Sequence, residues 1–143
     1  MAELKKRINS RTKGHSAERE ICKLFKKNGI DVTRNLIQTR SGGCDLITEG
    51  TLLEPFAIEI KRIGKWSPAI RKMHWEQAQR QADKIGKIPI LIWKIDFSTW
   101  MVEYKVEYQP GHKVIVIEYL ESWLSHYIES HTQYNCTPIL EKT

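Results

Sequence analysis

The stretch of sequence that decides the fold reads Phe56-Ala57-Ile58-Glu59-Ile60-Lys61. Apolar and polar side chains alternate along it with the period of two that is typical of a β-strand. Because every second side chain of a strand points to the same face, Glu59 and Lys61 are expected on one face and Ile58 and Ile60 on the other. We therefore expect this strand to hold a carboxylate and an ammonium group side by side on a half-buried scaffold.

Asp45 lies upstream of this strand, with thirteen residues between it and Glu59. The short apolar stretch Leu46-Ile47 follows it, and Glu49-Gly50-Thr51 predicts a turn that brings the chain back as a hairpin, with Asp45 opposite Glu59. Two converging carboxylates repel each other unless a cation joins them, and their hard oxygen atoms favour Mg²⁺ or Mn²⁺. Two acids beside a lysine predict a metal-dependent site that cleaves phosphodiester bonds.

A helix that stops at Asn28-Gly29 is predicted for residues 16–27. Its buried stripe, at helical spacing, consists of Ala17, Ile21, Leu24 and Phe25. Glu18 borders this stripe and can face the interior, so we interpret it as a functional residue. Glu20 lies on the other side, where we expect it to pair with Lys23 at the surface. The alternative for both acids is a favourable position in the first turn, near the positive end of the helix dipole.

Residues 38–44, directly before Asp45, include two adjacent glycines. Glycines let a bulky ligand approach backbone N–H groups, and Arg40 and Ser41 can hold a phosphate. The alternative is a flexible turn between strands. We favour phosphate binding because Asp45 follows the segment at once.

Together these motifs resemble the PD-(D/E)xK nuclease superfamily and, within it, the archaeal-type Holliday-junction resolvases, a type also found in viruses. The residues that carry the resemblance are Lys13-Gly14, Ala17-Glu18-Arg19-Glu20, Arg40-Ser41-Gly42-Gly43, Asp45 and Ile58-Glu59-Ile60-Lys61. The stretch Ile85-Gly86-Lys87-Ile88-Pro89-Ile90-Leu91, followed by Lys94, is similar to a helix end, turn and core strand of the family. Cys44 stands where the superfamily name has proline, at a position that shapes the turn and ligates no metal.

The resemblance implies an α/β protein with a single-domain restriction-endonuclease-like fold, in which helices flank a mixed β-sheet. It also implies a homodimer whose two active sites cut opposite strands of branched double-stranded DNA, so that four-way (Holliday) junctions are resolved by paired symmetric hydrolysis. The five tryptophans are a further hint of an interface. Two alternatives stay open: a restriction-like, repair or DNA-end-processing nuclease of the same fold, and a nucleic-acid-binding protein without catalytic activity.

The resemblance also implies roles for individual residues. The metal ligands, for Mg²⁺ with Mn²⁺ as a substitute, would be Asp45, Glu59, a backbone carbonyl near Ile60, and Glu18 for the same or a second ion. Lys61 would position the attacking water and stabilise charge that develops on the phosphate. Gln77, on the next predicted helix, would orient the water or a phosphate oxygen, although a plain surface position is the alternative. The candidate DNA contacts are Arg40, Ser41, Lys13, Arg62 and Lys65.

Downstream of these motifs the sequence predicts further regular elements. Ser67 as N-cap and Pro68 as first helical residue begin a helix over residues 68–84, with Trp75, Ala78, Ala82 and Ile85 along its buried side. Residues 88–93 are nearly all apolar, so this strand is expected at the centre of the sheet, covered on both faces. Further strands are predicted at residues 100–104 and 114–119, and a short helix at residues 120–128.

Length and composition fit one domain. With 143 residues, 41% of them hydrophobic, the chain can bury one ordinary core. We divide it into a basic N-terminal arm (1–13), a nuclease domain (14–128) and a polar C-terminal tail (129–143). No segment can cross a membrane and the first residues lack an apolar signal core, so we expect a cytoplasmic protein, or one of the host cytoplasm if it is virus-encoded. The three cysteines suit reduced thiols.

Charge is distributed unevenly along the chain. Residues 41–60 carry four acids and no base, whereas residues 1–40 carry eleven Lys and Arg against four acids, and residues 61–87 carry eight against two. Basic flanks attract a polyanion without reading its sequence. An acidic centre would repel the same polyanion unless it held a divalent metal, so the distribution favours a nuclease over a protein that only coats DNA.

Overall fold

The computed structural model describes residues 10–36 and 44–136 of the chain. Its elements are α1 (Ser10–Lys27), β1 (Thr33–Arg34), β2 (Leu46–Ile47), β3 (Phe56–Ile63), α2 (Pro68–Ile85), β4 (Ile88–Ile95), β5 (Met101–Gln109), β6 (His112–Tyr119) and α3 (Leu120–Cys136). Strands β3, β4, β5 and β6 form one sheet in that order, and β1 pairs with β2 separately. Because β3 and β4 are parallel and the other neighbours antiparallel, the sheet is mixed, as predicted.

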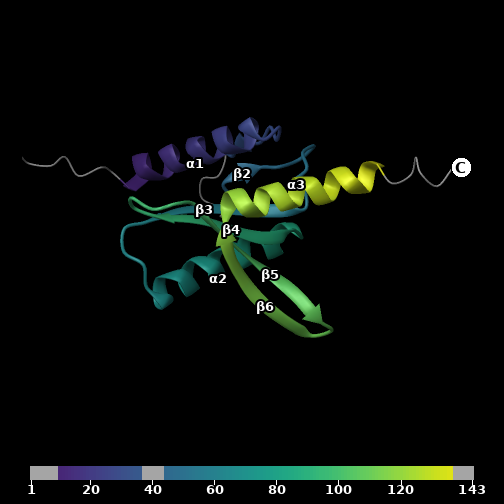
Figure 1. Cartoon of the computed structure of the whole chain (residues 1–143). Coiled ribbons are helices and arrows are strands. Elements are labelled where there is room, and N and C mark those ends of the chain that lie inside the picture. Colours follow the sequence, from purple (N-terminus) through teal and green to yellow (C-terminus); the bar gives the residue numbers. More distant parts are fainter. Residues whose placement is uncertain (1–9, 37–43, 137–143) are drawn as a thin grey trace, which may run out of the picture.

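Helices cover both faces of the four-stranded sheet (Figure 1). α1 and α3 lie on one face and α2 lies on the other, while the β5–β6 hairpin extends beyond the layers of helices. This is the α/β arrangement, a mixed sheet flanked by helices, that the sequence predicted.

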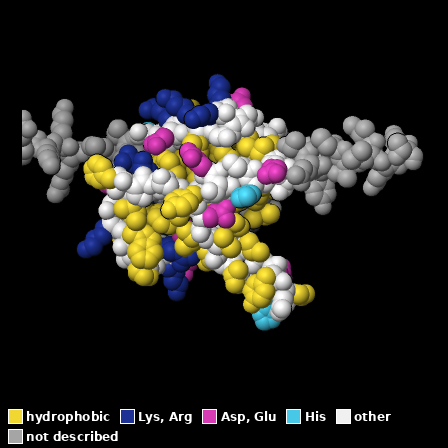
Figure 2. Space-filling model, viewed as in Figure 1, with side chains coloured by type: hydrophobic (Ala, Val, Ile, Leu, Met, Phe, Trp, Pro, Cys, Tyr) yellow, Lys and Arg dark blue, Asp and Glu magenta, His cyan; other side chains and the backbone are white. Residues whose placement is uncertain are grey.

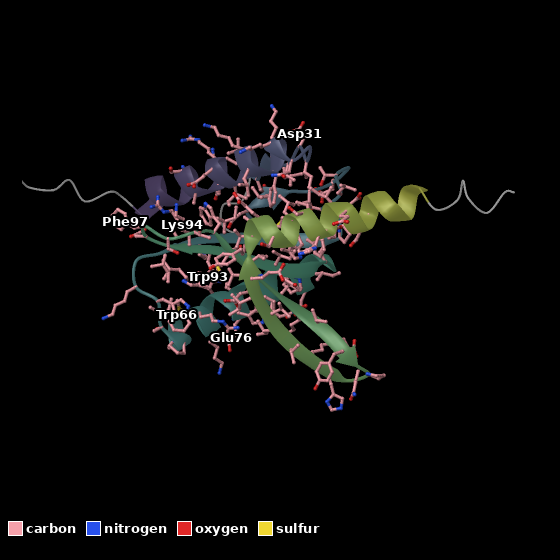
Figure 3. All side chains as sticks on the ribbon, viewed as in Figure 1. Asp31, Trp66, Glu76, Trp93, Lys94 and Phe97 are labelled. Carbon is pink, nitrogen blue, oxygen red and sulfur yellow. The ribbon has the colours of Figure 1, made fainter. Side chains whose placement is uncertain are left out.

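The alternation along β3 separates two hydrophobic cores. Ile58 and Ile60 belong to the larger core, under α1 and α3, whereas Ile63 belongs to the smaller core, under α2. β4 is covered on both faces, as predicted: Trp93 points toward α2 and its neighbour Lys94 points toward α1 (Figure 3). Glu59 has the same parity as Ile63 and therefore lies on the α2 face.

α2 begins and ends where its capping residues dictate. Ser67 Oγ accepts a hydrogen bond from the Ile70 N–H over 3.2 Å, and Pro68 is the first helical residue, as predicted. Gly86 ends the helix with φ of 66°, a left-handed conformation that glycine adopts without steric cost. Ile85 was predicted to be buried, but 49% of it is exposed, because it is the last residue of the helix.

Several elements are longer than predicted. α1 begins at Ser10 instead of residue 16, α3 continues to Cys136 instead of ending at residue 128, and β5 extends to Gln109. The extra residues are mainly polar, so they add no periodic apolar signal, although a helix or hairpin can continue through its backbone hydrogen bonds alone. The pair β1–β2 was not predicted, because two residues are too few to show a period.

Candidate active site

Asp45 is held against β3, which is an edge strand of its sheet. The Asp45 N–H donates to the Ile58 carbonyl over 3.0 Å, and Asp45 Oδ2 accepts a hydrogen bond from the Ile60 N–H over 2.7 Å. Only 6% of Asp45 is exposed. Since Ile58 and Ile60 flank Glu59, the two bonds bring the carboxylate of Asp45 beside Glu59, as expected. The predicted hairpin is wrong in its pairing, because among the described strands β2 pairs with β1 and not with β3.

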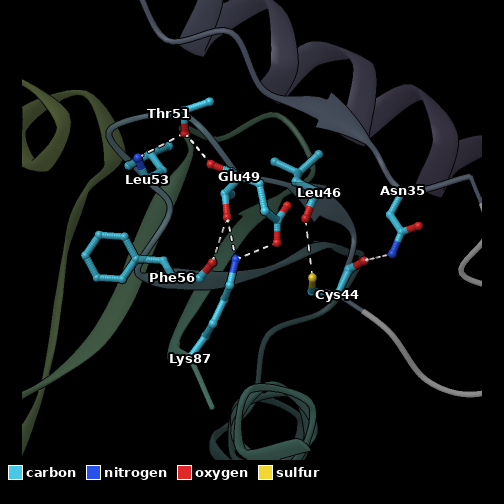
Figure 4. Close-up of polar contacts among 9 residues, drawn as sticks. Asn35, Cys44, Leu46, Glu49, Thr51, Leu53, Phe56 and Lys87 are labelled. Carbon is cyan, nitrogen blue, oxygen red and sulfur yellow. Dashed lines mark hydrogen bonds and ion pairs between the residues drawn. The ribbon is translucent and has the colours of Figure 1, made fainter. Parts of the chain in front are cut away.

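Polar contacts fix the segments on both sides of Asp45 (Figure 4). Asn35 Nδ2 donates to the Cys44 carbonyl over 3.1 Å, and Lys87 Nζ donates to Glu49 Oε1 over 2.9 Å. The first contact holds the turn before Asp45 and the second holds the turn after it. Cys44 is fixed here through its backbone, which suits a position that shapes a turn.

Glu59 is the most constrained acid of the site. It is 2% exposed, its Oε1 lies 3.1 Å from Lys61 Nζ, and its Oε2 is buried with no hydrogen-bond partner among the described residues. Burial first, and then the negative charge of Asp45, raise the pKa of Glu59 to about 7, against the opposing effect of Lys61. Lys61 therefore does not offset the effects of burial and of the second carboxylate on Glu59.

The oxygen atoms of this pair fit a hard divalent cation. In the described part of the chain, no group of three or more His, Cys, Asp or Glu side chains is arranged to hold a metal ion. Asp45 and Glu59 would therefore act as a pair, with the Ile60 carbonyl, water and a phosphate oxygen as further ligands. Mg²⁺ commonly binds in this way, through one or two carboxylates and several waters. The buried, unpartnered Glu59 Oε2 is the observation that supports the fit.

Glu18 lies at the border of the site. It forms an ion pair with Arg34 of β1, with Nε and Oε2 2.9 Å apart and both side chains largely buried. Its negative charge also contributes to the raised pKa of Glu59. Arg34 was missed by the sequence analysis, because the pair connects residues sixteen positions apart on different elements. A metal-binding role of Glu18 stays a prediction.

Glu20 does not have the partner that was expected. Instead of Lys23, it contacts the far end of β4 and the start of β5: Glu20 Oε1 accepts a hydrogen bond from Trp100 Nε1 over 2.9 Å and lies 3.7 Å from Lys94 Nζ. The reason is that α1 packs on the sheet, which brings the indole within reach of this side of the helix. Glu20 thus connects α1 to the sheet.

The α2 face opposite Glu59 carries three polar side chains. Gln77 is half-buried, and His74 Nδ1 and Gln81 Oε1 are buried without hydrogen-bond partners among the described residues. Burial, and then the positive charge of Lys61, lower the pKa of His74, so His74 lies close to the site. His74 was missed, although its spacing of seven residues from Gln81 places both on one side of the helix. The predicted role of Gln77 stays a prediction.

The predicted DNA contacts are placed only in part. Arg62 Nη2 lies 3.3 Å from Asp96 Oδ1, and Lys65 is exposed between β3 and α2. Lys13 belongs to α1, but its side chain lies outside the described residues, as do Arg40 and Ser41. The described contacts therefore surround the end of β3 that follows Lys61.

Two carboxylates and a lysine at the edge of a mixed α/β sheet define the class of metal-assisted nucleases with an Asp…Glu-x-Lys site. Residues 9–137 match the family described as phage putative PDDEXK endonuclease, and the chain belongs to this family. It is thus an endonuclease of the PD-(D/E)xK type, and the resemblance found in the sequence is confirmed. Nucleases of this type generally use divalent metal ions.

Among solved structures, the fold is similar to that of Hjc from Archaeoglobus fulgidus, a Holliday junction resolvase from an archaeal hyperthermophile. The sequences are 15% identical, the TM-score is 0.49, and the match covers 79% of this chain and 96% of Hjc. No curated protein matches the chain. None of the helices in the described part of the chain is both long and apolar enough to span a bilayer.

Proposed function

We propose that this endonuclease cuts branched double-stranded DNA at four-way junctions, with Mg²⁺ as its cofactor. The observation that supports hydrolysis at this site is the buried pair Asp45 and Glu59 beside Lys61, with an unpartnered Glu59 Oε2. The choice of junctions is supported by the motifs in the sequence that resemble archaeal-type resolvases. A homodimer would present two such sites to the two strands of a junction.

Each residue of the site has a task in this proposal. Asp45 and Glu59, with the Ile60 carbonyl, would hold Mg²⁺, and Glu18 of α1 would help to hold the same or a second ion. When bound, the metal would polarise the scissile phosphate and lower the pKa of water. The Lys61 ammonium, 3.1 Å from Glu59, would orient the attacking water and stabilise the negative charge that develops on the phosphate.

The substrate is the part of the proposal that needs a direct test. A labelled immobile four-way junction, linear duplex and single strand of the same sequence are incubated with the protein, with Mg²⁺ and with EDTA. Paired symmetric nicks in the junction alone, with Mg²⁺ only, are expected. Equal cutting of duplex or single strand would overturn junction selectivity and favour a general, restriction-like or repair nuclease. No cutting of any DNA would overturn the catalytic role.

A further inference from the structure

A surface hollow of about 580 Å³ lies between α2 and the β5–β6 hairpin, apart from the candidate active site. Cationic side chains from both elements line it: Arg71, Lys72 and Arg80 come from α2 and Lys105 comes from β5. Trp75 and Ile115 supply its apolar surface, and Gln79 and the single acid Glu76 complete its lining. In Figure 2, Lys and Arg side chains gather beside the base of the hairpin, where Figure 1 shows the hairpin leaving the body of the protein.

The floor of this hollow contains a buried ion pair that the active site does not use. Arg71 Nε donates to Glu103 Oε1 over 2.9 Å, and Glu103 is fully buried on β5, whereas 22% of the Arg71 side chain is exposed. A buried ion pair gives little net stability, because both charges lose their hydration. What it does provide is a fixed guanidinium group whose outer edge faces the hollow, and a fixed guanidinium is well suited to phosphate oxygens.

The other cations reach the hollow from its two sides. Lys105 Nζ lies 5.8 Å from the centroid of the Trp75 ring, so the Lys105 side chain reaches from the hairpin to α2. Among the described residues, neither Arg80 nor Lys105 forms an ion pair with an acid, and Lys72 has only the exposed Glu76 at 4.0 Å. The hollow therefore keeps an excess of positive charge that is open to solvent.

The position of the hollow relates it to the candidate active site. Glu59 of β3 is opposite Leu91 of β4, and Leu91 is opposite Glu103 of β5, so both acids lie on the α2 face of the sheet. α2 runs between them, with His74 on the side of the active site and Arg71 on the side of the hollow. A helix is about 10 Å wide. A duplex that reaches the active site can therefore also reach the hollow.

We propose that this hollow binds the sugar–phosphate backbone of a duplex arm of the DNA, about one helix width away from the cleaved bond. The identity of the ligand rests on the proposed function. Cations from two separate elements suit a polyanion, and contacts to phosphates carry no base information, so the site would anchor DNA of any sequence. The hairpin would act as the outer wall of this anchoring site.

The test measures binding in EDTA, where no cleavage is expected, with a labelled 30-base-pair duplex at several salt concentrations. The variant Arg80→Ala with Lys105→Ala removes two charges from the hollow. The control, Lys84→Ala with Lys113→Ala, removes one charge from α2 and one from β6 of the hairpin, both outside the hollow. Both pairs are exposed, and thermal unfolding checks that each variant folds.

The hollow variant should bind about tenfold more weakly at 0.1 M salt, and its plot of log K against log salt should be flatter by about 2. The control should change affinity less than about twofold. A charge-reversed pair, Arg80→Glu with Lys105→Glu, should weaken binding further. Equal binding by the hollow variant and the parent, or equal losses in the hollow variant and the control, would overturn the anchoring site and leave the proposed function intact. Failure of the parent itself to bind the duplex would likewise overturn the anchoring site, whereas the proposed function is tested by the cleavage of junctions.

Discussion

Glu59 and Glu103 are two buried carboxylates on the same face of one sheet, on either side of Leu91. They are 2% and 0% exposed, yet their surroundings differ in charge. Glu59 meets a second carboxylate, Asp45, and a single lysine, whereas Glu103 meets one arginine. Burial raises the pKa of both acids, and each has one cationic neighbour. Only Glu59 also lies beside a second carboxylate, so a bound cation would have more negative charge to offset there.

The position of each acid in the sheet strengthens this difference. β3 is an edge strand, so the Asp45 segment can approach Glu59 from the open side. β5 lies between β4 and β6, so Glu103 can be reached only from above, where α2 presents Arg71. The edge of the sheet thus suits a metal site, and the interior suits a permanent ion pair.

The largest expected effect is the loss of DNA cleavage when one of the two carboxylates at the edge strand β3 is removed. Asp45→Asn or Glu59→Ala should lower the cleavage rate at least about a thousandfold, because either change leaves a single carboxylate for the metal. Binding of DNA in EDTA should change little. Single-turnover cleavage of a labelled junction measures the first effect and gel shift measures the second. The control is Glu121→Gln, which changes an exposed acid of α3. Mg²⁺-dependent cleavage by contaminant-free Asp45→Asn protein would contradict the assignment of Asp45 as a metal ligand.

Removing the negative charge of Glu103, in the interior of the sheet, should affect the stability of the fold instead. Glu103→Gln leaves Arg71 without its anionic partner, so the free energy of unfolding should fall by about 3 kcal/mol. Urea unfolding at neutral pH, followed by tryptophan fluorescence, measures it. An unchanged midpoint would mean that the pair contributes nothing to the fold.

A change at Lys61 should affect the rate of cleavage without affecting metal binding. Lys61→Ala should lower turnover about a hundredfold, because the water and the developing charge lose their ammonium partner, with little change in Mn²⁺ affinity. Calorimetric titration with Mn²⁺ and single-turnover kinetics give the two quantities separately. Lys84→Ala is a matched control. Unchanged turnover would remove Lys61 from the mechanism.

The smallest expected effect concerns the pH dependence of stability that comes from Glu59. Because the folded-state pKa of Glu59 is about 7, above its unfolded value of 4.5, the folded protein holds the proton more tightly. The stability from this group is present below pH 4.5 and is lost as pH rises through 7. Between pH 5.5 and 7.5 the metal-free protein should lose about 2 kcal/mol that Glu59→Gln retains.

Urea unfolding in EDTA at both pH values checks this prediction. Glu59→Gln should be more stable than the parent at pH 7.5. Parallel pH profiles for the parent and Glu59→Gln would show that the carboxyl of Glu59 titrates normally.

Local patterns in the sequence were enough for the framework of the site. The alternation around Glu59 placed it and Lys61 on one face of β3, and the turn after Asp45 predicted that the chain returns with Asp45 near Glu59. The strand pairing of a hairpin was predicted wrongly, because β2 pairs with β1. Ser67 and Pro68 predicted the start of α2. These features follow from side-chain period, capping and turn chemistry, which act within a few residues.

Contacts between distant segments were decided only by the tertiary structure. The pairs Arg34–Glu18, Trp100–Glu20 and Arg71–Glu103 connect residues 16, 80 and 32 positions apart. No local pattern relates such residues, so Glu20 was expected at the surface, and Glu103 gave no sign of its burial. The sequence by itself determined which acids stand on the edge strand, because strand period is local. Only packing decided that Glu103 meets one arginine whereas Glu59 meets a lysine and a second carboxylate, because charge balance depends on what the fold places nearby.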